Sequence, residues 1–191
     1  MYQKYHTDAL VLGSIESGEA DRVLSLYTRD FGLVRARGTS LRAAKSKMRC
    51  ALQNYSLANV ALIRGKSGWR LAGAKSIATV NGENVKGVAA FARISGLVTR
   101  FVAGEEAHER LFEILLEAHT ALAGKTCEAW AAIEIVCVAR IMHTLGYISS
   151  EVLQTPLLSH TAYTDENLRE ATTLREELLR TINHAISETH L

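Results

Sequence analysis

The chain has 191 residues, of which 48% are apolar and 22% are charged. This length accommodates one domain or two small ones, and the composition excludes a disordered or membrane-embedded chain. The net charge of +2 is unevenly divided: residues 1–80 hold 13 Lys/Arg and 5 Asp/Glu, a net +8, whereas residues 81–191 hold 9 and 15, a net −6. Residues 31–82 contain ten basic residues and no acidic residue. Such an asymmetry indicates a polyanionic partner.

The cysteine content and the apolar segments bound the location of the protein. Cys50, Cys127 and Cys137 are not clustered, which argues against a disulfide scaffold and for a reducing, cytoplasmic compartment. The first ten residues lack the apolar segment of a signal peptide. The longest apolar run, residues 129–148, is interrupted by a glutamate, an arginine and a histidine. We therefore expect a buried core helix there rather than a membrane span.

The first 80 residues have the alternating pattern of β-strands. Five short stretches with strand character are separated by turns that contain glycine, and residues 65–68 form a hairpin signal between the last two. Five short strands are typical of a small barrel, and at this size of an OB-fold. The expected strands span residues 7–15, 22–28, 33–38, 54–65 and 69–77.

The third expected strand and the segment after it are rich in positive charge. Val34 and Ala36 alternate with Arg35 and Arg37, so both arginines should lie on one face of the strand. Residues 39–50 are polar and basic without a strand pattern. We expect this segment to be a loop with room for one helical turn.

Residues 81–191 have the pattern of helices, the third of which is apolar on nearly all sides and should be central. Thr126 can cap this third helix, and Thr164, followed by acidic residues, can cap the start of the last one. The chain is therefore predicted to be an α+β protein, with an OB-fold domain at residues 1–80 and a helical domain at residues 81–191. The helices expected before the last one span residues 84–103, 107–123 and 126–146.

Motifs for catalysis or metal binding fail on their spacing. Gly65-Lys66-Ser67 resembles the end of a P-loop, but Val60 stands where the pattern needs a glycine. Asp30-Phe31-Gly32 matches a kinase tripeptide without the other kinase elements. Cys127 and Cys137 would lie about 15 Å apart along one helix, too far to share a metal ion. We therefore predict no enzymatic activity, no catalytic residue, no metal site and no cofactor.

The basic residues of the first half are the strongest candidate site. Single-strand nucleic-acid binders combine a cationic groove with aromatic rings on which bases stack, and Tyr27, Phe31, Tyr55 and Trp69 lie among the cations. The alternative is a solvated basic surface with the aromatic residues in the core. Lys75 belongs to the same acid-free stretch. The predicted nucleic-acid-binding residues are Arg22, Arg35, Arg37, Arg42, Lys45, Lys47, Arg49, Arg64, Lys66 and Arg70.

A series of short motifs carries a family resemblance. They are Gly18-Glu19-Ala20-Asp21-Arg22, Tyr27-Thr28-Arg29-x-x-Gly32, Gly38-x-x-x-Arg42-x-x-Lys45-Ser46-Lys47, Arg64-Gly65 and, in the second half, Leu145-Gly146-Tyr147. In their order and spacing the N-terminal motifs resemble the RecO family of bacterial DNA repair proteins. The match in the helical half is weaker.

The resemblance implies a fold and a function. RecO-like proteins have an N-terminal OB-fold and a helical domain, bind single- and double-stranded DNA, and anneal complementary strands. They help to load the recombinase onto DNA coated by single-strand-binding protein, together with a RecR-type partner protein. This implies a nucleoid-associated recombination mediator in DNA repair. The DNA contacts that the resemblance implies are Arg22, Arg37, Arg42, Lys45 and Lys47.

The sequence also departs from the family pattern. Many members carry a Cys-rich zinc element after the Leu-Gly-Tyr segment, whereas residues 149–167 contain no cysteine. We therefore expect this chain to lack the zinc element. Two other interpretations stay open, a general OB-fold binder of single-stranded DNA or RNA, and a protein-interaction adaptor that acts through its acidic helical half.

Overall fold

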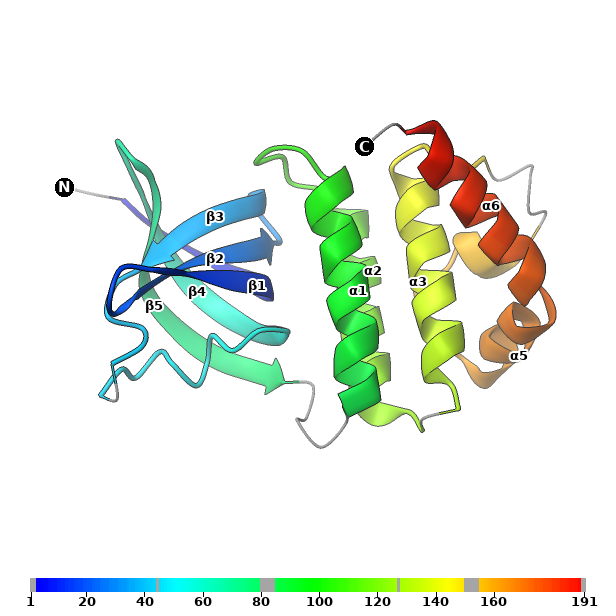
Figure 1. Ribbon diagram of the computed structural model, residues 1–191, viewed down its shortest axis with the longest axis horizontal. Helices are drawn as coiled ribbons and strands as arrows, with labels where there is room; N and C mark the ends of the chain where they lie inside the picture. The colour runs from blue at the N-terminus through cyan, green and yellow to red at the C-terminus, as the bar shows by residue number, and fades with distance from the viewer. Residues whose placement is uncertain (1–2, 44, 80–84, 127, 150–154, 190–191) are drawn as a thin grey trace. The chain divides into compact units, whose positions relative to one another are not determined.

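The structure is a computed structural model that describes residues 3–43, 45–79, 85–126, 128–149 and 155–189. The chain divides into two compact units, one that contains the strands and one that contains most of the helical residues (Figure 1). The first unit consists of Met1–Thr79 and Val102–Phe112, and the second of Val80–Phe101 and Glu113–Leu191.

The first unit is a closed five-stranded barrel. Its strand order is β1-β2-β3-β5-β4, with β4 pairing back to β1, and all pairs are antiparallel except the parallel pair of β3 and β5. Each of the five expected strands overlaps an observed one, so the predicted OB-fold barrel and the α+β class are confirmed. The strands are β1 (Lys4–Ser17), β2 (Asp21–Thr28), β3 (Gly32–Gly38), β4 (Ser56–Gly65) and β5 (Gly68–Thr79).

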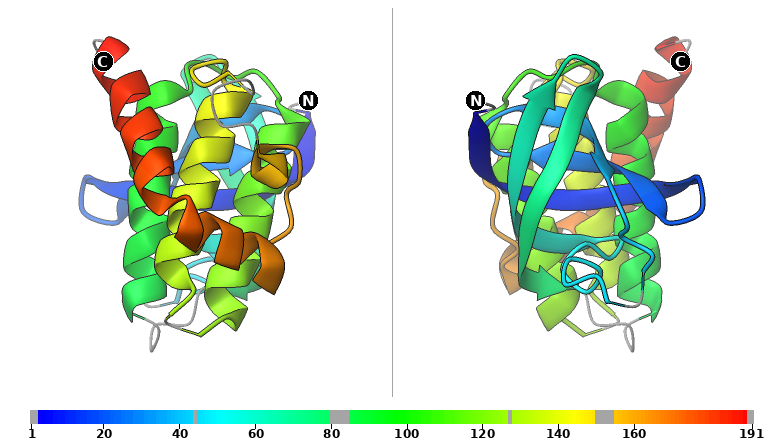
Figure 2. Two further views of the ribbon diagram at one scale, coloured as in Figure 1. Left: turned by 90° about the vertical axis from the view of Figure 1, so that its right-hand side faces the viewer. Right: turned by 90° about the vertical axis from the view of Figure 1, so that its left-hand side faces the viewer.

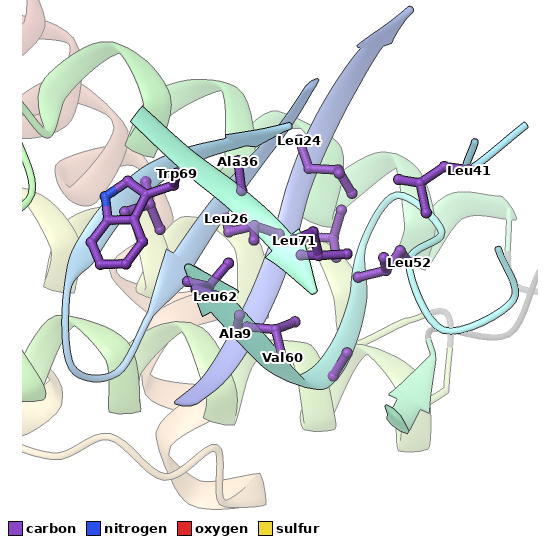
Figure 3. Packing of buried hydrophobic residues seen from close by; sticks show 13 residues of the cluster. Ala9, Leu24, Leu26, Ala36, Leu41, Leu52, Val60, Leu62, Trp69 and Leu71 are labelled. Carbon is purple, nitrogen blue, oxygen red and sulfur yellow. The ribbon is translucent and has the colours of Figure 1, made fainter. Parts of the chain in front are cut away.

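The core of the barrel is built from inward-facing side chains of all five strands (Figure 3). Along β3, for example, Val34 and Ala36 are fully buried, and along β5 Trp69 and Leu71 face the same interior. This alternation follows from the two-residue period of a strand. Full burial of a valine or leucine side chain stabilises the barrel by about 1.5–3 kcal/mol.

A long loop over residues 39–55, which we name the basic loop, connects β3 to β4 (Figure 2). Its described residues form turns without a helix, so the loop is confirmed, and one of these turns is closed by the hydrogen bond from Leu52 N to the carbonyl oxygen of Met48, four residues earlier, at 3.1 Å. Leu41 and Leu52 are 3% and 2% exposed, so both ends of the loop are anchored in the barrel core. A Cβ atom at Gly38 would lie 2.2 Å from Leu41 Cδ1, so a larger residue there would displace the Leu41 side chain.

The second unit is a helical bundle in which α3 contacts α1, α5 and α6. The predicted central position of this apolar helix agrees with its eight buried residues. No helix in the described part of the chain has the length and apolar character that a membrane crossing requires. The predicted start of the first helix, Asn84, lies outside the described residues. The helices are α1 (Val85–Phe101), α2 (Glu109–Gly124), α3 (Trp130–Thr144), η1 (Pro156–Leu158), α5 (Asp165–Thr173) and α6 (Arg175–Glu188).

The two predicted helix caps have different outcomes. Thr164 caps α5 as expected, because its side chain accepts a hydrogen bond from the backbone N of Asn167 at 3.2 Å. Thr126 is not the cap of α3; the residue before that helix is Ala129, which makes no side-chain cap. A turn separates the two, since the Ala129 amide donates to the Thr126 carbonyl oxygen.

The expected last helix is divided at Leu174, which ends α5 and precedes α6. Thr172 and Thr173, immediately before the break, donate their hydroxyls to the carbonyl oxygens four residues earlier, at 2.8 and 3.1 Å. Such side-chain bonds compete with the helical backbone and bend helices. The sequence contains no glycine or proline here, which is why the break was not predicted.

Candidate nucleic-acid interface

Two arginines of β3 lie on the outer face of the barrel. Arg35 and Arg37 are exposed and alternate with the buried Val34 and Ala36, so the predicted alternation is confirmed. The parallel pairing of β3 with β5 sets Arg37 opposite the exposed Arg70. Three guanidinium groups therefore occupy neighbouring strands, and we name Arg35, Arg37 and Arg70 the strand cations.

The basic loop adds four exposed cations, Arg42, Lys45, Lys47 and Arg49, which we name the loop cations. Two of them, Lys45 and Lys47, line a groove of about 490 Å³ between the loop and β5. The segment of β5 that contributes to the groove has only small side chains, so it does not obstruct the lysines. The other residues that line the groove are Thr39, Ser40, Ala43, Ser46, Met48, Ala72, Gly73 and Ala74.

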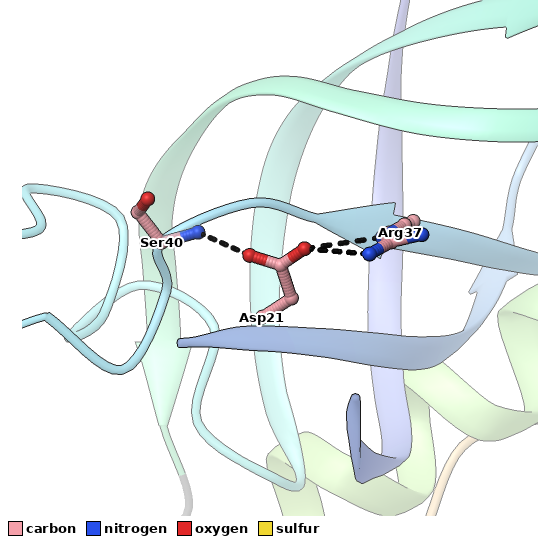
Figure 4. A network of polar contacts seen from close by, with 3 residues as sticks. All are labelled: Asp21, Arg37 and Ser40. Atoms are coloured by element: carbon pink, nitrogen blue, oxygen red, sulfur yellow. Dashed lines mark hydrogen bonds and ion pairs between the residues drawn. The ribbon is translucent and has the colours of Figure 1, made fainter. Parts of the chain in front are cut away.

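Asp21, the first residue of β2, binds both the end of β3 and the start of the basic loop (Figure 4). Its Oδ2 accepts hydrogen bonds from Nε and Nη2 of Arg37, at 3.1 and 2.9 Å, and its Oδ1 accepts one from the backbone N of Ser40 at 2.9 Å. The Ser40 amide and the Arg37 guanidinium lower the pKa of the Asp21 carboxyl from its ordinary value. The sequence marked Asp21 only as part of a motif, because this contact depends on the pairing of β2 with β3.

Two further predicted cations form ion pairs. Arg42 Nη1 lies 3.2 Å from Glu16 Oε2, and Arg64 Nη2 lies 3.2 Å from Glu105 Oε2. The Arg64 guanidinium also lies over the ring of Trp69, 5.3 Å from its centroid. Stretches that lack acids in the sequence therefore meet acids in space, although exposed pairs of this kind are weak.

The two remaining predicted cations, Arg22 and Lys66, lie apart from the strand cations and the loop cations. Arg22 shares the inward side of β2 with Leu24 and Leu26, and its Nε is buried without a hydrogen-bond partner in the described structure. It is therefore not brought together with the strand cations. Lys66 lies in the turn between β4 and β5. Within the described residues no ion pair is formed by Arg35, Lys45, Lys47, Arg49, Lys66 or Arg70.

The aromatic residues do not form the expected stacking surface. Tyr27 is fully buried, and Trp69 is 4% exposed. Phe31 is half-buried and packs with Tyr5 and Trp69, at ring-centroid distances of 5.3 and 5.1 Å. The prediction that Tyr27 and Trp69 offer platforms for bases is wrong, because Trp69 packs in the barrel core and the buried ring of Tyr27 stacks on that of Phe112, with 6.4 Å between their centroids. Tyr55 is half-buried as well.

Among the described residues no group of three His, Cys, Asp or Glu side chains is placed to hold a metal ion. Cys137 is buried, and this burial raises the pKa of its thiol to about 12, so it stays protonated at neutral pH. Cys50 is exposed, and Cys127 lies outside the described residues.

The closed five-stranded barrel, with cations on its outer face and on the loop after β3, defines the first unit as an OB-fold domain. Residues 1–81 match the family model described as recombination protein O N terminal. Residues 1–81 thus match the N-terminal domain of the RecO family, and this match confirms the resemblance found in the sequence.

Individual relatives agree with this assignment. The chain is 43% identical over 63 residues to the DNA repair protein RecO of Desulfitobacterium hafniense, which is 33% of this chain and 23% of that protein. It is 32% identical over 120 residues to the DNA repair protein RecO of Rubrobacter xylanophilus, covering 62% of this chain and 48% of the relative. For the DNA repair protein RecO of Pelotomaculum thermopropionicum, the identity is 28% over 145 residues, with coverages of 75% and 56%. The chain thus spans between 23% and 56% of the length of these three relatives.

Proposed function

We propose that this chain is a DNA-binding recombination mediator in DNA repair, and that it holds DNA through the phosphate backbone. The observation that carries the proposal is the gathering of the three strand cations and four loop cations on one small barrel. The names of the relatives, DNA repair protein RecO, support a role in repair. The proposed function requires no covalent chemistry.

Phosphate contact is favoured over base contact because two of the four candidate aromatic platforms, Tyr27 and Trp69, are buried. With Tyr27 and Trp69 in the core, the cations are the main groups that can meet a nucleic acid. Phosphate contacts position a strand without reading its sequence. We therefore expect similar affinity for different sequences, and binding of both single and double strands.

This mode of binding supports strand annealing. Two complementary strands repel each other through their phosphates, and a surface that neutralises part of this charge lowers the repulsion while leaving the bases free to pair. The groove lined by Lys45 and Lys47 offers one track for a backbone, and the strand cations offer a second contact region on the same barrel.

The experiment that tests the site compares two triple variants of the full chain. Replacing Arg42, Lys45 and Lys47 by alanine should weaken binding to oligonucleotides of every sequence by about tenfold or more, since each phosphate contact adds to the affinity. The measurement is fluorescence anisotropy at fixed salt.

The matched control replaces Lys86, Arg175 and Arg180, three exposed cations of the helical unit, by alanine. It changes the net charge by the same amount and should alter the affinity by less than about twofold. Equal losses in both triple variants would show that only the total charge matters. A loss confined to one DNA sequence would contradict backbone binding.

The proposed partners are single- and double-stranded DNA, a RecR-type protein and single-strand-binding protein. Annealing of complementary oligonucleotides, with and without single-strand-binding protein, separates this proposal from a general single-strand binder. A mediator should accelerate pairing, whereas a passive binder protects single strands and slows it. An adaptor that acts through its helical half would keep full function in the loop triple variant.

A further inference from the structure

We propose that Asp21 is a positioning residue of the DNA-binding surface, which increases the affinity for DNA by fixing Arg37 and the start of the basic loop. The inference rests on the proposed function, because it concerns the same surface. The proposed effect of Asp21 on the affinity for DNA is opposite to the effect of its charge. An acidic side chain beside a polyanion would by charge alone reduce the affinity.

Asp21 lies beside Arg37 on the outer face of the barrel. In the pairing of β2 with β3, Val23 lies opposite Arg37, so Asp21 stands two residues away on the same outer face, at the diagonal position. The carboxylate holds the Nε–Nη2 edge of the guanidinium and is itself only 20% exposed, whereas the Arg37 side chain is 58% exposed. Asp21 therefore orients the guanidinium from one edge and leaves the rest of it accessible to a phosphate.

Asp21 also holds the start of the basic loop, at Ser40. Ser40 adopts a left-handed backbone conformation, with φ of 54°, which is uncommon for a residue other than glycine. Asp21 Oδ1 accepts the hydrogen bond of its amide. Two residues later, the backbone N of Arg42 donates to the carbonyl oxygen of Ala20 at 2.9 Å, and its side chain pairs with Glu16.

The β1–β2 hairpin thus holds the loop from outside, while Leu41 anchors it in the barrel core. The conformation of the loop up to Arg42 is fixed before any ligand arrives. Lys45 and Lys47, which line the groove, follow directly.

Asp21 has two opposing effects on the affinity for DNA, its negative charge and its ordering of the cations, and we expect the ordering to be the larger. An exposed acid near DNA is screened by salt and should change the affinity by only about twofold. Long cationic side chains and loops lose conformational freedom when they bind, and a surface that is already ordered loses less. Because Asp21 orders one strand cation and the start of the segment that carries four more, its removal should cost about tenfold in affinity.

The test compares Asp21→Asn with Glu19→Gln in the full chain. Both substitutions remove one negative charge from the same hairpin region, and Glu19 is exposed without an ion pair among the described residues. The probe is a fluorescent single-stranded oligonucleotide of mixed sequence. Glu19→Gln should leave the affinity unchanged or raise it up to about twofold, and Asp21→Asn should lower it about tenfold.

Salt dependence provides a readout that a loss of stability alone would not move. In Asp21→Asn the slope of log K against log salt should become shallower by about 0.7 for each phosphate of a single strand that the protein no longer neutralises. Arg37→Lys is the second variant, since it keeps the charge but gives up the two-point contact with Asp21. It should lose affinity in the same direction, and thermal unfolding of each variant establishes that the compared proteins are folded.

The outcomes separate this inference from the proposed function. If Asp21→Asn binds as tightly as Glu19→Gln, with an unchanged salt slope, the positioning role is overturned while DNA binding stands. If Asp21→Asn does not fold, unchanged affinity in Arg37→Lys overturns the role, and a loss there supports it. If the wild-type chain itself binds DNA without salt dependence, the proposed function fails.

Discussion

Arg35 and Arg70 of the barrel and Arg140 of the helical unit show two opposite uses of arginine. In the barrel, Arg35 and Arg70 lie on the outer face, exposed to solvent. In the helical unit, Arg140 of α3 is completely buried. It donates hydrogen bonds to three backbone carbonyl oxygens at 2.7 to 3.1 Å and lies over the ring of Tyr163. A cation of the second kind stabilises a fold, and only a cation of the first kind is available to a ligand.

Ion pairs engage cations of the helical unit, as they do in the barrel. Arg93 of α1 binds Glu134 of α3 through both carboxylate oxygens, and this contact raises the pKa of Arg93. Lys125 binds Asp165 at 2.6 Å. The net charge of each half is therefore an incomplete guide to binding, because what matters is how many cations keep free donors.

The largest expected effect tests the structural arginine. Arg140→Met should destabilise the chain by about 3 kcal/mol, since it leaves three carbonyl oxygens without their donor. The measurement is urea unfolding, and Arg180→Met, at an exposed site of α6, is the control that should change stability by less than about 0.5 kcal/mol. At a temperature where the variant is folded, its DNA affinity should equal that of the wild type. If Arg140→Met were as stable as the wild type, Arg140 would not have the stabilising role that distinguishes it from the strand cations.

The second prediction concerns the strand cations, whose removal should lower the affinity for DNA and leave the stability of the fold unchanged. The double substitution of Arg35 and Arg70 by alanine should reduce DNA affinity about three- to tenfold, because two cations can no longer neutralise phosphates. Both side chains are exposed, so the free energy of unfolding should stay within about 0.5 kcal/mol of wild type. Affinity is measured by anisotropy and stability by urea unfolding. A large loss of stability with unchanged affinity would reverse the roles assigned to the two units.

The smallest expected effect concerns the buried thiol of the helical unit. The pKa of Cys137 is raised to about 12 in the folded chain, from an ordinary value of 9.0. Between these two values the unfolded chain ionises first, so the stability that this group contributes is present below pH 9 and falls as the pH rises. By pH 10 the loss should reach about 1 kcal/mol.

Cys137→Ala serves as the control for this titration. Its unfolding free energy should decline less between pH 8 and pH 10 than that of the wild type, and the difference isolates the thiol from other alkaline groups. Equal declines would indicate that burial does not suppress the ionisation of Cys137.

Much of the barrel could be predicted because strands have a two-residue period. The alternation of Arg35 and Arg37 with small apolar residues gave the outer face of β3 correctly. The same rule, applied to Trp69 and Leu71 on either side of Arg70, would also have placed the tryptophan inside the barrel. The expectation of a stacking platform overlooked that signal.

The parts of the candidate site that could not be predicted from the sequence are contacts between distant segments. Asp21, Glu16 and Glu105 reach cations 16 to 41 positions away in the sequence, and those distances depend on strand register and on how the chain returns to the barrel. A count of acids along the chain cannot detect them. The break at Leu174 was not predicted either, since no glycine or proline stands near it in the sequence.

The most direct test of the central claim is the salt dependence of DNA binding by the wild-type chain. If six of the exposed barrel cations contact phosphates, log K should fall with log salt with a slope of about −4 for a single strand, and mixed-sequence oligonucleotides should give the same slope. A flat response, or a slope found with one sequence only, would contradict an account in which the barrel holds the DNA backbone.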